Sequence, residues 1–277
     1  MRWYADNSDL NSSRGAEIPD LLLFGGILVS PEVERDLRKS VEEIKAHHAH
    51  PRVPIKWNFK DLRSMYEKQG MAEMYEKMLA ESKVWRSEIF ENITQYDFKI
   101  ILACVQSHSI ERKKIKGKKL DLVRYVFSNG LMRVALHAKE IEAKQMQVIL
   151  DWPEGGDPYP FNSEYSAAYN NGTTREGNVS YHSGPLKDLE FMDSAVYANM
   201  KHSTLLQFAD LVVGACRECI EVAIGGKESG LGVEVTKMIS DKFRGYPENI
   251  YGKGISVASG DTKFRNNVKT FIEKELQ

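Results

Sequence analysis

The feature that most constrains this chain is an apolar segment with an aspartate at its centre, LLQFADLVVGA, residues 205–215. Its length and its content of Leu, Ala and Val favour a buried helix. At about 3.6 residues per turn, the polar and small residues around it fall on one narrow stripe: Ser203, Gln207, Asp210, Gly214 and Arg217. An isolated ionised carboxylate in such a place is costly unless it is paired or binds a metal. We therefore expect the stripe to face polar groups inside the protein.

Length and composition indicate one large α/β domain or two small ones. The chain has 277 residues, of which 42% are hydrophobic and 28% charged, and a formal net charge of −1. This charge excludes a chain-wide attraction to polyanions and leaves only local basic patches. Three cysteines, an odd number, favour reduced thiols. Because we find no signal-like N-terminus and no apolar run of about 18 residues, we expect a cytoplasmic protein that has no contact with a membrane.

The order of hydrophobic patterns predicts a mixed sheet with helices on its faces. The first two strands suit an antiparallel pair, and the third resembles an edge strand because of its prolines. Strands are expected at residues 2–8, 20–30, 51–59, 96–107, 146–152 and 189–197. Helices are expected at 31–50, 64–95, 120–143, the apolar segment, 233–243 and 263–276. The Gly-, Asn-, Ser- and Tyr-rich stretch 154–180 is expected to be an irregular loop, with tyrosines suited to base stacking or to packing on the protein.

Three aspartates fall at informative places. Asp6 lies in the first strand, Asp151 ends the strand VILD, and Asp210 lies on the polar stripe. Open α/β sheets usually bind ligands beyond the carboxyl ends of their strands, so these side chains converge if the two strands are neighbours. Close carboxylates repel one another and commonly share a divalent cation, for which hard oxygens favour Mg²⁺ or Mn²⁺. Taken singly, an aspartate at a strand end also fits a cap or turn residue, an alternative that fits Asp210 least because its surroundings are apolar.

Five segments in order resemble family 3800 of the domains of unknown function: WYADNS, LLLFGGILVS, PIKW, VILDW and DSAVYANMKHSTLLQFADLVVGA. Members typically open with Asp-Glu-Ser-Gly, continue to a Gly-Gly strand and a Glu-x-Lys element, and close on a Gln-x-Ala-Asp helix. The resemblance covers most of residues 1–220. It implies a ribonuclease H-like domain over 1–225, with a helical C-terminal extension, 226–277, packed on it. It also implies metal-dependent phosphodiester cleavage, in proteins encoded near mobile and phage-defence genes.

The resemblance carries the family's site residues to positions of this chain. Asp6, Asp151 and Asp210 match the acidic residues, Lys56 the lysine and Gln207 the glutamine. These positions imply that the three aspartates bind Mg²⁺ or Mn²⁺, that Lys56 takes part in catalysis, and that Gln207 contacts substrate.

Two positions depart from the family's pattern. Asn7 replaces the glutamate expected after Asp6, and Pro54 replaces the one expected two residues before Lys56. Asn7 can still ligate a metal through its carbonyl oxygen, but proline offers no side-chain ligand. The residues that could supply a fourth ligand are Asn58, Asp61, Asp157 and Asp193.

The run RKKIKGKK, residues 112–119, holds six basic residues in eight positions. Its lysines include Lys113, Lys114, Lys116 and Lys118. One interpretation is a loop that contacts phosphates and gives the chain a nucleic-acid-binding surface; the other is a solvated connector. Together these features predict a metal-dependent nuclease or phosphodiesterase. The alternatives are a catalytically degenerate member that binds nucleic acid or protein, and a toxin or antitoxin component active only with a partner. The sequence leaves the oligomeric state open.

Other metal-binding or catalytic patterns are weaker. The histidines of HHAH, residues 47–50, fit cationic residues at a helix end as well as metal ligands. Cys216 and Cys219 form a C-x-x-C inside the apolar helix, where free cysteine acts as a small hydrophobe. His182 and His202 lie nearest in sequence to the expected site and could shuttle a proton, or serve as structural histidines.

Overall fold

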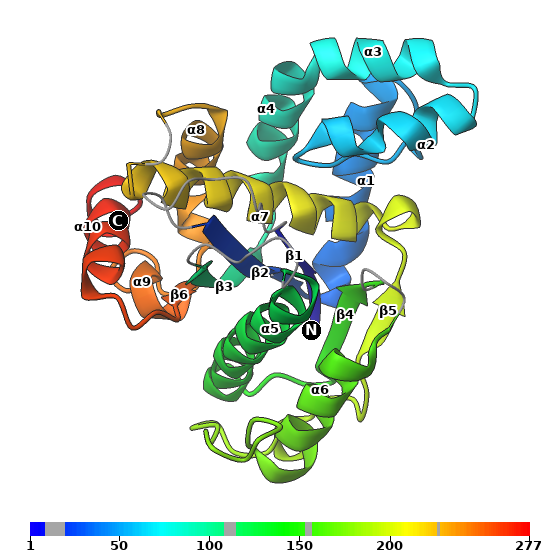
Figure 1. Ribbon diagram of the computed structural model, residues 1–277. Helices are drawn as coiled ribbons and strands as arrows, with labels where there is room; N and C mark the ends of the chain where they lie inside the picture. Colours follow the sequence, from blue (N-terminus) through cyan, green and yellow to red (C-terminus); the bar gives the residue numbers. More distant parts are fainter. Residues whose placement is uncertain (9–19, 108–114, 153–156, 226–227) are drawn as a thin grey trace.

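A mixed six-stranded sheet forms the centre of the protein in the computed structural model, which describes residues 1–8, 20–107, 115–152, 157–225 and 228–277 (Figure 1). Its strands are β1 (Arg2–Asn7), β2 (Asp20–Val29), β3 (Phe98–Ser107), β4 (Gln147–Asp151), β5 (Val196–Ala198) and β6 (Ile255–Val257). Their spatial order is β5-β4-β1-β2-β3-β6. The β1–β2 and β2–β3 pairs are antiparallel, and the three other pairs are parallel. The expected α/β mixed sheet is confirmed.

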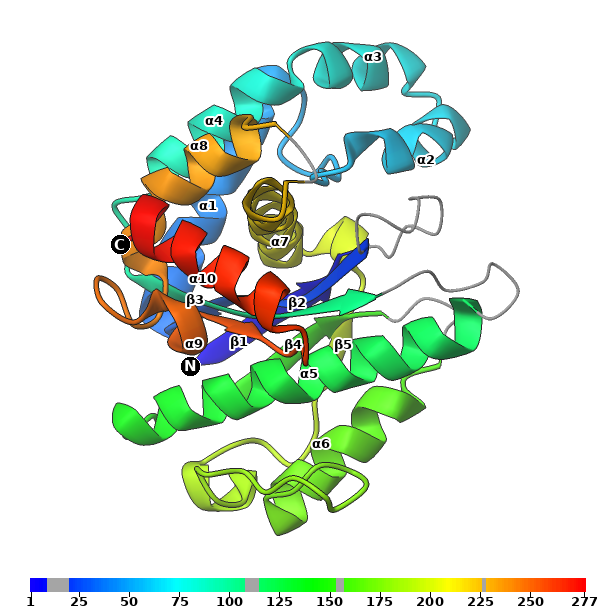
Figure 2. The same ribbon diagram turned by 60° about the vertical axis from the view of Figure 1, so that its left-hand side comes forward.

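Helices cover both faces of the sheet (Figure 2). One face packs against α1 (Pro31–His48), α4 (Ser82–Ile93) and α7 (Thr204–Ala223), and the other against α5 (Ile115–Glu140) and α6 (Tyr159–Asn171). Strand side chains alternate between the two cores: Tyr4 joins the α7 core, and its neighbours Trp3 and Ala5 join the α5 core. Because Asp6 and Asp151 follow the same alternation, they lie on the face that α7 covers.

Glycine in β2 allows α7 to lie close to the sheet. A Cβ atom on Gly26 would lie 2.1 Å from the Tyr4 carbonyl oxygen and 3.0 Å from Cβ of Ala209, which belongs to α7. No side chain fits in this space without displacing backbone, so Gly26 of β2 and Ala209 of α7 together allow the close approach that brings Asp210 to the level of the strand ends.

The expected third strand, residues 51–59, is wrong. These residues form turns and irregular backbone that lead into a short 3₁₀ segment, Phe59–Leu62. Their hydrogen bonds go to side chains instead of a sheet: Tyr66 donates to the Pro54 carbonyl, and the Trp57 amide donates to Asp210. The prolines remove ladder donors, and the edge of β3 is taken by β6, a three-residue strand too short to be recognised in the sequence.

Three expected helical or loop regions also differ from the structure. Residues 64–95 form three helices, α2 (Arg63–Lys68), α3 (Ala72–Ala80) and α4, with Gly70 at φ 71° between the first two. The expected loop 154–180 contains α6, which ends at Gly172 in the left-handed conformation. The C-terminal extension is not wholly helical, because β6 lies between α9 (Ile250–Lys253) and α10 (Thr262–Glu275). The strand expected at 189–197 is reduced to β5.

The remaining long elements agree with expectation. The helices α1 and α10 lie close to their predicted bounds, as do the strands β1 to β4. The helix expected at 233–243 is α8 (Leu231–Met238) followed by a 3₁₀ turn. Among the described residues, none of the helices has both the length and the apolar composition that crossing a bilayer requires.

Candidate functional site

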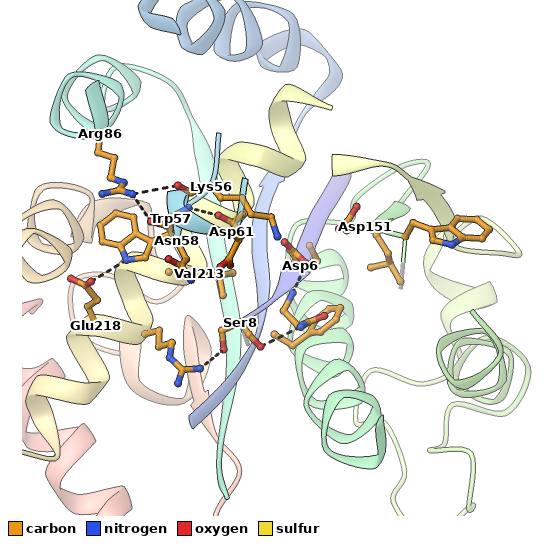
Figure 3. A pocket seen from close by; sticks show the side chains of 18 of the residues that line it. Asp6, Ser8, Lys56, Trp57, Asn58, Asp61, Arg86, Asp151, Val213 and Glu218 are labelled. Atoms are coloured by element: carbon orange, nitrogen blue, oxygen red, sulfur yellow. Dashed lines mark hydrogen bonds between the residues drawn. The ribbon is translucent and has the colours of Figure 1, made fainter. Parts of the chain in front are cut away.

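A polar cavity of about 500 Å³ opens at the carboxyl ends of β1 and β4, beneath α7 and the segment that follows Pro54. Three predicted site residues, Asp6, Asp151 and Asp210, line it together with Lys56. Figure 3 shows Asp6, Asp151 and Lys56 among the lining residues. Its other polar lining residues are Asn7, Ser8, Asn58, Asp61, Arg86, Arg217, Glu218 and Glu221. The structure therefore brings the three expected carboxylates and the expected lysine to one place.

Strand pairing brings Asp6 and Asp151 together. The strands β1 and β4 are parallel neighbours, and Ala5 pairs with Leu150, so the next residue of each strand is an aspartate. Asp210 approaches from α7, where it is half-buried and faces the cavity. The expectation that these strands are neighbours is confirmed.

Asp6 is the most strongly perturbed carboxyl group of the site. Its side chain is only 8% exposed. Burial raises its pKa well above the usual range, and the nearby charges of Asp210 and Asp151 raise it further, while Lys56 opposes them. Burial also raises the pKa of Asp151, against the Met200 and Trp152 amides and Lys56. The site thus holds negative charge that is only partly compensated.

A backbone amide orients each of the three carboxylates. The amide of Asn7 donates to Asp6 Oδ1 at 2.7 Å, that of Met200 to Asp151 Oδ1 at 2.7 Å, and that of Trp57 to Asp210 Oδ2 at 2.6 Å. Hydrogen bonds of this kind fix the direction in which a carboxylate presents its oxygens. The last one also ties the loop that carries Lys56 to α7, and Figure 3 shows the Lys56 side chain extending toward Asp6.

A tryptophan and an arginine, neither of them a predicted site residue, line the cavity beside Asp210. Trp57 Nε1 donates to Glu218 at 3.2 Å, and the Arg86 guanidinium lies 4.9 Å from the centre of the Trp57 ring. Arg86 also donates to the carbonyl oxygens of Lys56 and Trp57. Burial lowers the pKa of Arg86 to about 10, so it remains a cation at neutral pH. Together these contacts hold the loop that delivers Lys56.

Gly214, one turn after Asp210, provides the space for Trp57. A Cβ atom at Gly214 would lie 2.1 Å from Cγ and 2.2 Å from Cβ of Trp57. The glycine on the predicted polar stripe therefore leaves the space into which the Trp57 side chain packs. Its neighbours on the stripe also meet polar groups, since Arg217 donates to the Leu21 carbonyl at 2.6 Å and to Ser8 at 3.2 Å.

We expect Gly214→Ala to lower stability by about 1–3 kcal/mol, because Trp57 must move to relieve the overlap. Since Trp57 moves with the Lys56 loop, the variant should also lose function of the site. Urea unfolding measures the first effect. In a Trp57→Gly background both the indole and its Cβ are absent, so adding Gly214→Ala should cost little; a full additional loss in the double variant would contradict this account.

Two residues assigned by resemblance have other contacts. The Asn7 side-chain amide lines the cavity and donates to the Ser8 carbonyl at 3.2 Å, which leaves its oxygen as the atom suited to a metal. Gln207 is 1% exposed and is not among the cavity-lining residues. It accepts from Lys45 at 2.8 Å and donates to the Met200 and Lys201 carbonyls. Gln207 therefore has a structural place, and the expected contact with substrate is not supported.

Two of the four candidates for a fourth ligand line the cavity, and two do not. Asp61 and Asn58 line the cavity, and the Asn58 amide donates to Asp61 at 2.8 Å. Asp157 accepts from the Tyr159 amide before α6, and Asp193 accepts from Ser194; neither is a lining residue. Of the four, only the pair after Lys56 is placed to contribute.

The basic run is partly helical. The helix α5 begins at Ile115, five residues before the expected start, so Lys116 and Lys118 belong to a helix and not to a loop. Lys113 and Lys114 lie outside the described residues. The prediction that this run contacts phosphates remains a prediction.

The weaker metal patterns have structural contacts. His48 lies between Glu81 at 2.7 Å and Glu88 at 2.8 Å, and so joins α1 to the α3–α4 region. Cys216 and Cys219 are buried free thiols whose pKa values are raised by burial. His182 and His202 are exposed, and the described lining of the cavity includes neither of them.

The donors of the cavity suit a hard divalent cation in their chemistry. They are carboxylate oxygens, which such a cation prefers as ligands. The carboxylate of Asp6 is buried next to the negative charges of Asp210 and Asp151. Within the described part of the chain, however, no group of three or more His, Cys, Asp and Glu side chains is arranged to hold a metal ion. The cavity thus offers fitting ligands without a preassembled coordination shell.

Compared with protein-family models, curated proteins and solved structures, the chain matches none. The family resemblance rests on the quoted sequence segments alone.

Proposed function

We propose that this protein is a divalent-metal-dependent phosphodiester hydrolase, a nuclease of the ribonuclease H-like kind. The observation that carries the proposal is the meeting of Asp6, Asp151 and Asp210, from two strands and a helix, in one polar cavity with Lys56. The mixed sheet with helices on both faces supports the same resemblance. Localisation and cellular context remain expectations of the sequence.

In this proposal Asp6, Asp151 and Asp210 hold one or two Mg²⁺ or Mn²⁺ ions, and Asn7 offers a neutral oxygen beside them. When bound, such ions activate water and neutralise charge on the phosphate. Lys56 compensates the carboxylates and is placed to orient a phosphate oxygen or a ligating carboxylate. Arg86 keeps the Lys56 loop in position through the two carbonyl groups it contacts. The proposal keeps the sequence-based prediction that basic residues of 112–119 contact nucleic acid.

Asp210→Asn is expected to abolish tight Mn²⁺ binding and cleavage while sparing the fold. The amide has nearly the same shape and keeps an oxygen to accept from the Trp57 amide, so the change removes charge and little else. Calorimetry with Mn²⁺, and cleavage assays on labelled single- and double-stranded DNA and RNA, measure both effects. Asp193→Asn, an exposed aspartate outside the cavity lining, is the matched control. Cleavage retained in Asp210→Asn would refute the assignment.

A second candidate is a non-catalytic member of the same family that binds nucleic acid or a protein partner. The substitutions Asn7 and Pro54, and the lack of a preassembled metal shell among the described residues, favour it. This candidate predicts binding without hydrolysis in Mg²⁺, Mn²⁺ or Ca²⁺. The calorimetry above separates the two, because a protein that binds no Mn²⁺ in its wild-type form cannot be the proposed hydrolase.

A further inference from the structure

An exposed indole lies at the edge of the cavity. Trp152 follows Asp151 directly, lines the cavity and is 51% exposed. Two of the other tryptophans, Trp3 and Trp85, are at most 1% exposed, and Trp57 is half-buried under Arg86. Leaving a large apolar ring in water forgoes the stabilisation of burial, which makes an exposed ring next to a polar site a candidate for ligand contact.

Neighbouring residues hold the Trp152 ring and backbone in place. It packs edge-to-face on Tyr197, with ring centres 6.0 Å apart and an interplanar angle of 76°. The Tyr197 hydroxyl donates to Asn162 Oδ1 at 2.7 Å, and the Trp152 amide donates to the Ala198 carbonyl at 2.9 Å. Backbone and ring are therefore positioned before any ligand binds, which reduces the entropy lost on binding.

We propose that Trp152 stacks on an unpaired nucleobase of the substrate and so selects single-stranded or locally opened nucleic acid. This inference rests on the proposed function, because it places the base one residue from Asp151 and thus beside the phosphate bound there. Aromatic side chains bind bases of any identity through their π-faces, whereas bases inside a duplex are stacked on each other. The site would be tolerant of sequence and selective for strandedness.

The neighbouring residues place a phosphodiester strand next to the indole. Asp6 and Asp151 follow paired residues of β1 and β4, and both line the cavity together with Trp152. Because the carboxylates repel a bare phosphate, the strand binds there through the Mg²⁺ or Mn²⁺ of the proposed function, which offsets both negative charges and leaves a base to reach the indole. The same cavity then serves both halves of a nucleotide.

The test compares two fluorescein-labelled oligonucleotides of eight units, oligothymidylate and an abasic strand with the same phosphates. Binding to the full chain is measured by anisotropy in Ca²⁺, with strand integrity checked on a gel. Trp152→Ala should weaken oligothymidylate binding about 5- to 150-fold, the range expected for one stacked base, and leave the abasic strand unaffected. Trp152→Phe should restore much of the affinity. Tyr246→Ala, which removes a ring that is 45% exposed but not in the described cavity lining, is the control.

The outcomes separate the stacking site from the hydrolase. Equal binding of oligothymidylate by wild type and Trp152→Ala overturns the inference, as does a wild type that binds neither strand or prefers neither. If Trp152-dependent binding is found but nothing is cleaved in Mg²⁺ or Mn²⁺, the stacking site stands and the proposed function fails. If cleavage persists in Trp152→Ala with unchanged affinity for oligothymidylate, the proposed function stands and the stacking inference is overturned.

Discussion

Asp6→Asn is expected to remove Mn²⁺ binding and, in the same protein, to raise the melting temperature of the metal-free form at neutral pH. Asp6 is buried, and the charges of Asp210 and Asp151 already lie beside it. Replacing its carboxylate with an amide removes that repulsion and keeps an oxygen for the Asn7 amide. A gain of stability together with a loss of ligand binding is the usual sign of a site that stores unfavourable charge for function.

The pH dependence follows from the direction of the shift. The pKa of Asp6 is raised in the folded protein, so the protonated form is the one that folding favours. Its contribution to stability is complete below the ordinary aspartate pKa of about 3.9 and is lost as the pH rises through the raised value. Metal-free wild type should therefore lose stability over this interval, relative to Asp6→Asn. Melting temperatures measured across pH in EDTA test this.

Added Mn²⁺ should reverse the order of the two proteins. A ligand that binds only the folded state stabilises it by about 2.7 kcal/mol at one hundred times its dissociation constant, and Asp6→Asn should show none of this gain. Mn²⁺ binding by wild type should also tighten with rising pH, because the ion competes with the proton on Asp6. Equal Mn²⁺-induced shifts in wild type and variant would refute the role of Asp6.

Gln207→Ala is expected to destabilise the protein by about 3 kcal/mol, since it leaves a buried ammonium without its partner. Lys45 is 2% exposed, donates to Gln207 at 2.8 Å, and has a pKa that burial lowers to about 8. The variant also frees the Met200 and Lys201 carbonyls. Because the Met200 amide orients Asp151, Mn²⁺ affinity should fall as well.

Matched variants separate this network from a general effect of losing a glutamine. Gln95→Ala, at an exposed position, should change stability by no more than about 0.5 kcal/mol. In a Lys45→Met background, Gln207→Ala should lower the free energy of unfolding much less, because no buried charge then loses its hydrogen-bond partner. Additive losses in the double variant, measured by urea unfolding, would show that Lys45 and Gln207 act independently.

Several features of this protein were predictable because they follow from local periodicity. Hydrophobic periodicity located Asp6 in β1, Asp151 at the end of β4 and Asp210 on the polar stripe of α7, and the apolar runs identified β2, β3 and β4. Their convergence was predicted only on the condition that β1 and β4 are neighbours. The stripe of α7 does meet polar groups, as expected. The surroundings of Asp210 differ in detail from the expected buried position. Its side chain is half-buried at the edge of the cavity and accepts a hydrogen bond from the Trp57 amide.

Other features were not predictable, because the contacts that decide them join distant parts of the chain. Residues 51–62 carry prolines, aromatic residues and charges in no regular period, and their path is set by Asp210, Arg86 and the space at Gly214. Gln207 appeared to be a site residue, but its partner Lys45 lies 162 residues away. The helix α6 was not predicted, because its Gly-, Asn-, Ser- and Tyr-rich surroundings have a composition typical of loops.

The sequence by itself determined the α/β class, the main strands and helices, and the three aspartates, two on strands and one on the polar stripe of α7. Periodicity determines these features, and it is a property of neighbouring residues. Only the tertiary structure decided which loop carries Lys56 to those carboxylates, which glycine admits Trp57, and which tryptophan remains in solvent beside Asp151. Packing between distant segments determines these, through the shape and charge that each side chain meets.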